Sequence, residues 1–293
     1  MKVRGSIVAL ITPMHADGSV DFESLTRLIE FHIESGTHGI VSVGTTGESA
    51  TLSVAEHLAV IEHSVKVVDG RIPLIAGTGA NATSEAIELS RRARSVGADA
   101  CLSVVPYYNK PNQAGLIAHY KSIADSVDLP LILYNVPGRT VADLHNQSVV
   151  ELMHHENIIA IKDATGDLRR GKELIDLTKG HLDVLSGDDG TALELIKMGA
   201  VGDISVTANV APSHMSRLCD YALAGKFLEA EELDRQLRTL HQLLFIEANP
   251  IPVKYAVSKL GYTHNALRLP LVPLAEQYRA DLDKALEIVV KKF

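Results

Sequence analysis

Residues 39–68 read GIVSVGTTGESATLSVAEHLAVIEHSVKVV, and they contain one complete strand–helix unit. The first five residues, 39–43, are a short apolar run of the kind that forms a strand covered on both faces. Ser53 and Glu56 match a capping box, which predicts that a helix begins here and continues over Val54–Val68. The stretch therefore predicts a strand, a glycine-rich turn and a helix, in that order.

The same order recurs along residues 1–225, where each apolar run is followed by a stretch with helical periodicity. The runs are continuously apolar rather than alternating, which is typical of parallel strands covered on both faces. Eight such units fit a closed (β/α)8 TIM barrel, an α/β fold, better than an open sheet. The runs lie at residues 7–11, 39–43, 72–76, 100–105, 130–134, 158–161, 182–185 and 203–206.

The last part of the chain, residues 226–293, has no strand signal. Helical periodicity covers residues 226–246, 250–260 and 273–290, with prolines and a glycine between these segments. We therefore expect two regions, a catalytic barrel at 1–225 and a C-terminal helical region at 226–293 that packs on it.

Composition excludes several classes of protein. The chain has 293 residues, of which 46% are apolar, and a formal charge of −8 that argues against binding to nucleic acid or anionic membranes. It has two cysteines, Cys101 and Cys219, so we expect buried thiols, no disulfide framework and a cytoplasmic location. No apolar stretch approaches the roughly 18 residues of a membrane-spanning helix.

Lys162 directly follows the apolar run at residues 158–161. Active sites of (β/α)8 barrels lie at the carboxyl ends of the strands, where this lysine is expected. Lys162 is either a surface residue whose ammonium reaches solvent or a nucleophile that forms an imine with a carbonyl substrate. Burial at a strand end favours the neutral amine that such an attack requires.

Other polar groups follow neighbouring runs and favour the imine. Tyr134 could move protons beside an imine, or it is a structural tyrosine with a satisfied hydroxyl. Thr45 and Thr46 could offer donors to a carboxylate, or they simply form the loop after a strand. Arg139 suits a second carboxylate through a bidentate pair, with a surface ion pair as the alternative.

Two further patterns carry less weight. Residues 77–82 read GTGANA and match a dinucleotide-binding fingerprint, but they fall in the third of eight units, so we expect no nucleotide. The 13 histidines include no His-Glu-x-x-His spacing, and the two cysteines are too far apart for Cys-x-x-Cys. The sequence therefore predicts no metal site and no cofactor.

Longer motifs resemble a known family, and the resemblance extends over the whole chain. GTTGE at residues 44–48, YNVP at 134–137 and Lys162 resemble the N-acetylneuraminate lyase and dihydrodipicolinate synthase superfamily of lysine-imine (β/α)8 aldolases. Further stretches are similar to the dihydrodipicolinate synthase family within it. They are PYYN at 106–109, VPGRT at 136–140, LSGDD at 185–189, ISVTAN at 204–209 and NPIPVK at 249–254.

The resemblance implies a lyase of the diaminopimelate route to lysine, which condenses pyruvate with L-aspartate 4-semialdehyde. Lys162 would form the imine, and Tyr134, Thr45 and Tyr108 would move protons. Tyr108 would reach in from a neighbouring subunit of a homotetramer, built as a dimer of dimers. Substrate contacts would come from Thr46 and the Ile204 backbone for the pyruvate carboxylate, Arg139 for the carboxylate of the aldehyde, and Gly187.

The resemblance also implies a feedback site for free lysine. Val54 stands where lysine-sensitive members carry a polar or charged group, often histidine or glutamate, so we expect weak or absent inhibition. Asp163 stands where many relatives carry Glu, and it retains the carboxylate. The residues that match the lysine site are Ser49, Ala50, His57, Gly79, Asn81, Glu85 and Tyr107.

Two rival functions remain open at this point. A sialic-acid or sugar-acid lyase would share the imine chemistry, but its aldehyde site needs hydroxyl partners rather than Arg139. A carboxylate-binding or regulatory protein without enzymatic activity is the other rival, because a fold alone does not give a function. Borohydride trapping of a pyruvate imine separates this second rival from the enzymes.

Overall fold

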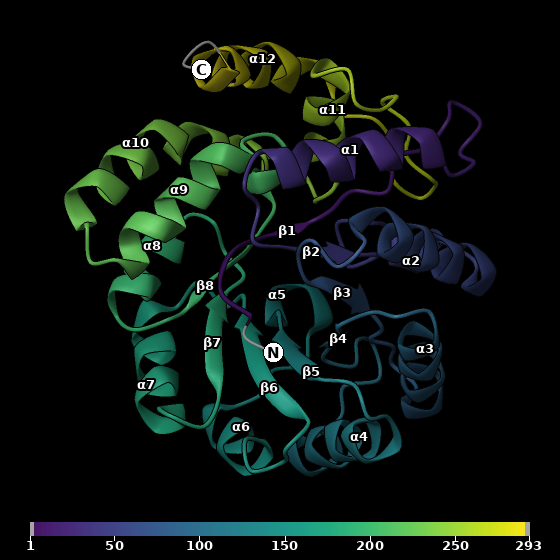
Figure 1. The fold of residues 1–293 in the computed structure, drawn as a ribbon, viewed down its shortest axis with the longest axis vertical. Helices are drawn as coiled ribbons and strands as arrows, with labels where there is room; N and C mark the ends of the chain where they lie inside the picture. The colour runs from purple at the N-terminus through teal and green to yellow at the C-terminus, as the bar shows by residue number, and fades with distance from the viewer. Residues whose placement is uncertain (1–2, 291–293) are drawn as a thin grey trace.

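The computed structural model describes residues 3–290, and it shows a closed barrel of parallel strands surrounded by helices (Figure 1). The strands follow one another around the barrel in chain order, and β8 pairs with β1 to close it. The predicted (β/α)8 barrel is therefore confirmed. The strands are β1 Gly5–Ala9, β2 Gly39–Ser42, β3 Leu74–Gly77, β4 Ala100–Val104, β5 Leu131–Asn135, β6 Ile158–Asp163, β7 Asp183–Ser186 and β8 Gly202–Ser205.

Each predicted apolar run forms a strand whose ends lie within two residues of the expected positions. Successive side chains of a strand point alternately into the barrel and toward the helices. Ile7 and Val41 belong to the cluster inside the barrel, whereas Val8 and Ile40 pack in the larger cluster under the helices. Burial on both faces explains why the runs are continuously apolar.

Helices connect the strands, and the longer ones cover the outside of the barrel, whereas the short α5 lies near its centre in this view (Figure 1). Ser53 and Glu56 form the predicted capping box at the start of α2, and Asp21 caps α1 by accepting a hydrogen bond from the Ser24 amide. The helices along the barrel are α1 Phe22–Glu34, α2 Val54–Val68, α3 Thr83–Ser95, α4 Gln113–Ser126, α5 Pro137–Thr140, α6 Asn146–Leu152, α7 Leu168–Thr178, α8 Ala192–Lys197 and α9 Pro212–Leu223.

The C-terminal region is helical: α10 Phe227–Leu243, α11 Ile251–Lys259 and α12 Glu276–Val290. Helix α10 packs against α9, and α12 lies against α10 and α11 on one side of the barrel (Figure 1). Within residues 3–290, no helix is both long and apolar enough to cross a membrane.

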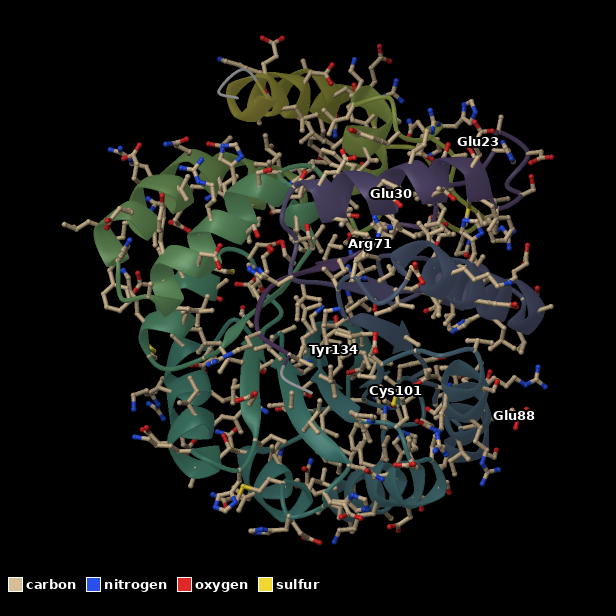
Figure 2. All side chains as sticks on the ribbon, in the orientation of Figure 1. Glu23, Glu30, Arg71, Glu88, Cys101 and Tyr134 are labelled. Atoms are coloured by element: carbon tan, nitrogen blue, oxygen red, sulfur yellow. The ribbon has the colours of Figure 1, made fainter. Side chains whose placement is uncertain are left out.

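The thiols lie inside the molecule, and charged side chains stand on the outer helices. Cys101 lies among the barrel strands, whereas Glu30 and Glu88 project from the helices (Figure 2). Cys101 and Cys219 are both free and buried, as the sequence predicted. Burial raises the pKa of Cys101 to about 11, so its reactive thiolate form is scarce at neutral pH.

One buried carboxyl group lacks the partners that usually stabilise a charge. Asp203 on β8 is fully buried, and no described residue donates a hydrogen bond to it. The neighbouring Asp189 accepts hydrogen bonds from the amides of Val206 and Thr207, each at 3.0 Å. Burial, together with the Asp189 carboxylate, raises the pKa of Asp203 well above its usual range. Folded Asp203 therefore keeps its proton at pH values where the unfolded chain has lost it.

This shifted pKa predicts a pH-dependent stability. The folded chain binds the proton of Asp203 more tightly, so this contribution is complete below about pH 4 and is lost as the pH rises. Asp203→Asn has nearly the same size and shape and takes up no proton. We expect the Tm of this variant, relative to the parent, to rise as the pH increases above about 4. Differential scanning fluorimetry measures it, and a constant or falling difference would contradict the shift.

Candidate active site

Lys162 lies on β6 at the carboxyl end of the barrel. Its Cα pairs in register with Tyr134 of β5 on one side and with Leu185 of β7 on the other. Lys162 and Tyr134 are both buried, and Lys162 Nζ lies 4.4 Å from the centre of the Tyr134 ring. The structure thus brings together the residues that the sequence proposed for imine formation and proton transfer.

Gly187, which follows β7, leaves the space that the Lys162 side chain occupies. A Cβ atom at position 187 would lie 2.6 Å from Lys162 Cε and 2.8 Å from Ala164 Cβ, which is closer than two carbon atoms can approach. The sequence proposed Gly187 as a substrate contact. In the structure, a glycine is needed here for the lysine itself.

The turn after β2 carries Thr45 and Thr46 to the same rim. Thr46 is buried, and its Oγ1 accepts a hydrogen bond of 2.9 Å from Nδ2 of Asn249. Because Thr46 already accepts here, its own O–H can be donated to a carboxylate. Arg139, on α5, donates to the backbone carbonyl of the same Asn249 at 3.2 Å. Asn249 therefore contacts residues of both proposed carboxylate sites, a role that sequence reasoning missed.

A buried ion pair fixes this turn from behind. Glu48 has a left-handed backbone, with a φ of 57°, and its Oε1 lies 2.5 Å from Nζ of Lys254 on α11. Both side chains are 0% exposed, and Glu48 Oε2 also accepts a hydrogen bond of 3.1 Å from the Arg268 amide. Burial lowers the pKa of Lys254, while Glu48 opposes this shift. The C-terminal helices thus form part of the framework of the site.

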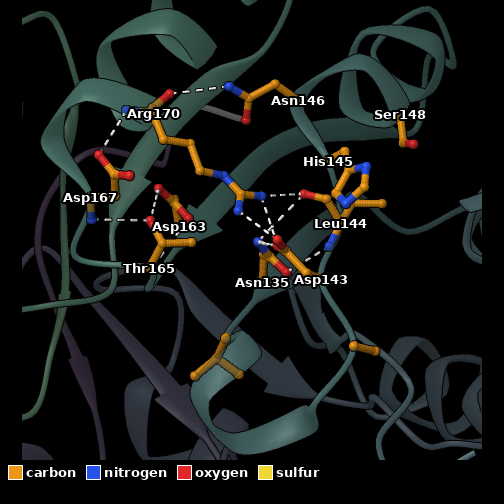
Figure 3. A network of polar contacts seen from close by, with 12 residues as sticks. Asn135, Asp143, Leu144, His145, Asn146, Ser148, Asp163, Thr165, Asp167 and Arg170 are labelled. Atoms are coloured by element: carbon orange, nitrogen blue, oxygen red, sulfur yellow. Dashed lines mark hydrogen bonds and ion pairs between the residues drawn. The ribbon is translucent and has the colours of Figure 1, made fainter. Parts of the chain in front are cut away.

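A second polar network lies at the ends of β5 and β6 (Figure 3). Arg170 of α7 donates two hydrogen bonds to Asp143, at 2.7 and 2.8 Å. Asn135 of β5 donates to the same carboxylate at 2.9 Å. Asp163 of β6 lies beside this group, and burial raises its pKa although Arg170 opposes the change. Asn135 and Asp163 directly follow the two residues of the pair, so the network holds the strand ends that carry them.

A cavity of about 320 Å³ opens beside the rim. Thr45 and Arg139 line it together with most residues of the proposed lysine site, so the two sites share one space. His57 in its wall lies with Nε2 at 2.8 Å from the Gly77 carbonyl, and burial lowers the pKa of this imidazole. The lining consists of Thr45, Ser49, Ala50, Leu52, Val54, His57, Gly79, Ala80, Glu85, Leu89, Val104, Tyr107, Val136, Arg139 and Thr140.

Seven proposed residues lie outside this lining: Lys162, Tyr134, Thr46 and Gly187, described above, and Ile204, Asn81 and Tyr108. Ile204 is buried in the cluster inside the barrel. Asn81 does not line the cavity, and its backbone carbonyl accepts a hydrogen bond of 2.8 Å from Asn109. Tyr108 is 88% exposed, with a left-handed backbone at a φ of 75°. Its predicted catalytic role and its predicted contact with a neighbouring subunit stay predictions.

A family model, curated relatives and solved structures all match this chain to dihydrodipicolinate synthases. The model of the dihydrodipicolinate synthetase family matches residues 2–289. A 4-hydroxy-tetrahydrodipicolinate synthase of Pseudomonas putida is 58% identical over 274 residues, which are 94% of each chain. The chloride-inhibited dihydrodipicolinate synthase of Acinetobacter baumannii, crystallised with pyruvate, matches with a TM-score of 0.98 and 56% identity over 99% of each chain.

A more distant solved structure is similar over nearly its whole length. It is the DHDPS of Cyanidioschyzon merolae with lysine bound, at a TM-score of 0.94, 35% identity and 98% coverage of each chain. A family match across almost all residues and relatives above half identity agree with the barrel and its strand-end lysine. The chain belongs to the dihydrodipicolinate synthetase family.

Proposed function

We propose that this chain condenses pyruvate with L-aspartate 4-semialdehyde through a lysine imine, in the diaminopimelate route of lysine biosynthesis. The observation that carries the proposal is Lys162, buried at the end of β6 with the Tyr134 ring beside its amine. Relatives that match nearly the whole chain are named 4-hydroxy-tetrahydrodipicolinate synthase. The chemistry needs no metal or cofactor, because the imine itself activates pyruvate.

The first half of the reaction takes place at Lys162. Its neutral amine attacks the ketone carbon of pyruvate, water leaves, and a protonated imine forms. Thr46 and the backbone of Ile204 hold the pyruvate carboxylate, with Thr46 donating the O–H that Asn249 leaves available. The protonated imine withdraws electrons from the methyl group, which loses a proton and becomes the carbon of an enamine. Tyr134 stands where it can accept and return these protons.

The second half uses the groups around the cavity. The enamine carbon attacks the aldehyde carbon of the semialdehyde, and Arg139 binds the carboxylate of this substrate. The amine of the semialdehyde then attacks the imine carbon and displaces Lys162 as the ring closes. Thr45 and the Tyr108 of a neighbouring subunit carry protons between Tyr134 and solvent, which requires an oligomer.

An assay with Arg139→Ala tests the substrate assignment. We expect the parent to consume pyruvate and semialdehyde together, and the variant to form the pyruvate imine normally. Its kcat/KM for the semialdehyde should fall about 10- to 100-fold, because a charge-assisted hydrogen bond is worth roughly 1.5–3 kcal/mol. Arg91→Ala, at an exposed position of α3, is the matched control.

Two results would count against this assignment. An unchanged kcat/KM in Arg139→Ala would remove the arginine from the aldehyde site. A parent enzyme that ignores the semialdehyde but joins pyruvate to a sugar aldehyde would be a sugar-acid lyase instead.

Tyr108→Phe tests the proton relay between subunits. The variant loses one hydroxyl and should keep its fold and oligomeric state, while kcat falls about 10²- to 10⁴-fold, as for other general acid–base groups. Tyr278→Phe on α12 is the control. A variant that is folded, oligomeric by light scattering and fully active would show that Tyr108 has only a packing role.

We assign free lysine to the part of the cavity that Glu85, Tyr107 and Val54 line. Glu85 offers a carboxylate to an ammonium group, and burial together with Glu85 raises the pKa of Tyr107, which keeps that phenol protonated. The solved relative with bound lysine supports this assignment. Val54 in the same wall supplies neither charge nor hydrogen bond, so the affinity for lysine should be low.

Titration of the activity with L-lysine tests this assignment. We expect half-inhibition at millimolar concentration or above in the parent. Val54→His should lower that concentration about 10- to 100-fold, because a hydrogen bond to a charged group contributes roughly 1.5–3 kcal/mol. Val54→Leu is the control and should behave as the parent. Complete inhibition of the parent well below millimolar would show that residue 54 does not set the sensitivity.

A further inference from the structure

Two histidines and one aspartate from opposite ends of the chain meet on the outer surface. His15 precedes α1, Asp21 is its N-cap, and His264 lies between α11 and α12. One nitrogen of each imidazole and one oxygen of the carboxylate all lie within 4.8 Å of one another. The proposed reaction uses none of these three residues, and none of them lines the cavity beside the rim.

The two segments that carry these residues are held together by other contacts. His15 donates its amide to the Ser19 carbonyl at 2.8 Å, which closes a tight turn before α1. Arg268 reaches across from the C-terminal segment and donates to the Gly18 carbonyl of that turn at 2.9 Å. The turn and the segment after α11 consequently lie side by side (Figure 1). These contacts involve neither imidazole ring, and they hold the two histidines close to each other.

Asp21 supplies a fixed negative charge between them. Its Oδ1 accepts the Ser24 amide at 2.9 Å, and its Oδ2 accepts the Ser24 hydroxyl at 2.6 Å. The carboxylate is buried, and these two hydrogen bonds hold it in place. His15 Nδ1 lies 3.8 Å from the same Oδ2. Each carboxylate oxygen has a further lone pair that can bind a cation.

We propose that His15, Asp21 and His264 bind a divalent transition-metal ion, with zinc as the best match. Two imidazoles and a carboxylate are a common ligand set for zinc, whose bonds to nitrogen and oxygen are about 2.0–2.2 Å long. Ligand atoms around such an ion lie about 3–4 Å apart, which rotation of the two exposed imidazoles achieves from the observed spacing. Water completes the coordination.

A metal ion at this site joins the turn before α1 to the segment between α11 and α12. It binds the folded chain and not the unfolded one, so it raises the thermal stability by mass action. The proposed reaction uses none of its ligands, so kcat should not change. The bound ion therefore crosslinks the turn before α1 to the segment between α11 and α12.

Calorimetric titration with ZnCl₂ tests the proposal on the full chain, purified without a histidine tag and treated with a chelator. We expect one saturable site per chain and a rise in Tm of several degrees with zinc. His15→Ala and His264→Ala should each lower the zinc affinity at least about tenfold, and Co²⁺ should give visible absorption in the parent only. Because both imidazoles are exposed, these variants should fold as the parent does.

His154→Ala is the control, because His154 and His181 form another histidine pair, with ring centres 6.0 Å apart. This variant should bind zinc as the parent does. The proposal fails if the parent shows no saturable binding, or if both His15→Ala and His264→Ala bind zinc like the parent. It also fails if His154→Ala is the variant that loses binding.

Discussion

A buried ion pair between the ammonium group of Lys254 and the carboxylate of Glu48 holds the site together. Lys254 and Glu48 are 206 residues apart in the chain, and both side chains are 0% exposed. Removing one partner of such a pair leaves an uncompensated buried charge, which costs about 3–5 kcal/mol. The native fold therefore requires α11 to dock against the turn after β2. The same docking brings Asn249 to Thr46 and Arg139.

The barrel supplies the other half of the geometry. Parallel register places Lys162 beside Tyr134, and the side chains deeper in the barrel are apolar. The Lys162 amine, the nucleophile of the proposed reaction, thus lies beside a phenol ring and above apolar side chains. On the outer face of the same strands, Arg170 and Asp143 hold the strand ends in place. Strands β5 and β6 thus carry Tyr134 and Lys162 on the inner face of the barrel, and the next residues, Asn135 and Asp163, on the outer face beside this network.

Local patterns allowed the sequence to predict the barrel, its strands to within two residues, and the capping box at Ser53. They also indicated Lys162, because a lysine that ends an apolar run is visible in the sequence itself. Contacts between distant segments leave no such pattern. The roles of Asn249 and Arg170 could not be predicted for this reason. His15, Asp21 and His264 likewise form no short metal-binding motif in the sequence, because His264 lies far along the chain from the other two.

Borohydride trapping shows whether Lys162 forms an imine with pyruvate. The protein is incubated with pyruvate, reduced with sodium borohydride, digested and mapped by mass spectrometry. We predict one pyruvate-derived adduct per chain, on the peptide that contains Lys162, together with loss of activity. Borohydride without pyruvate should leave both the peptide and the activity unchanged. An unmodified Lys162, or an adduct on another lysine, would contradict the assignment of Lys162 as the residue that forms the imine.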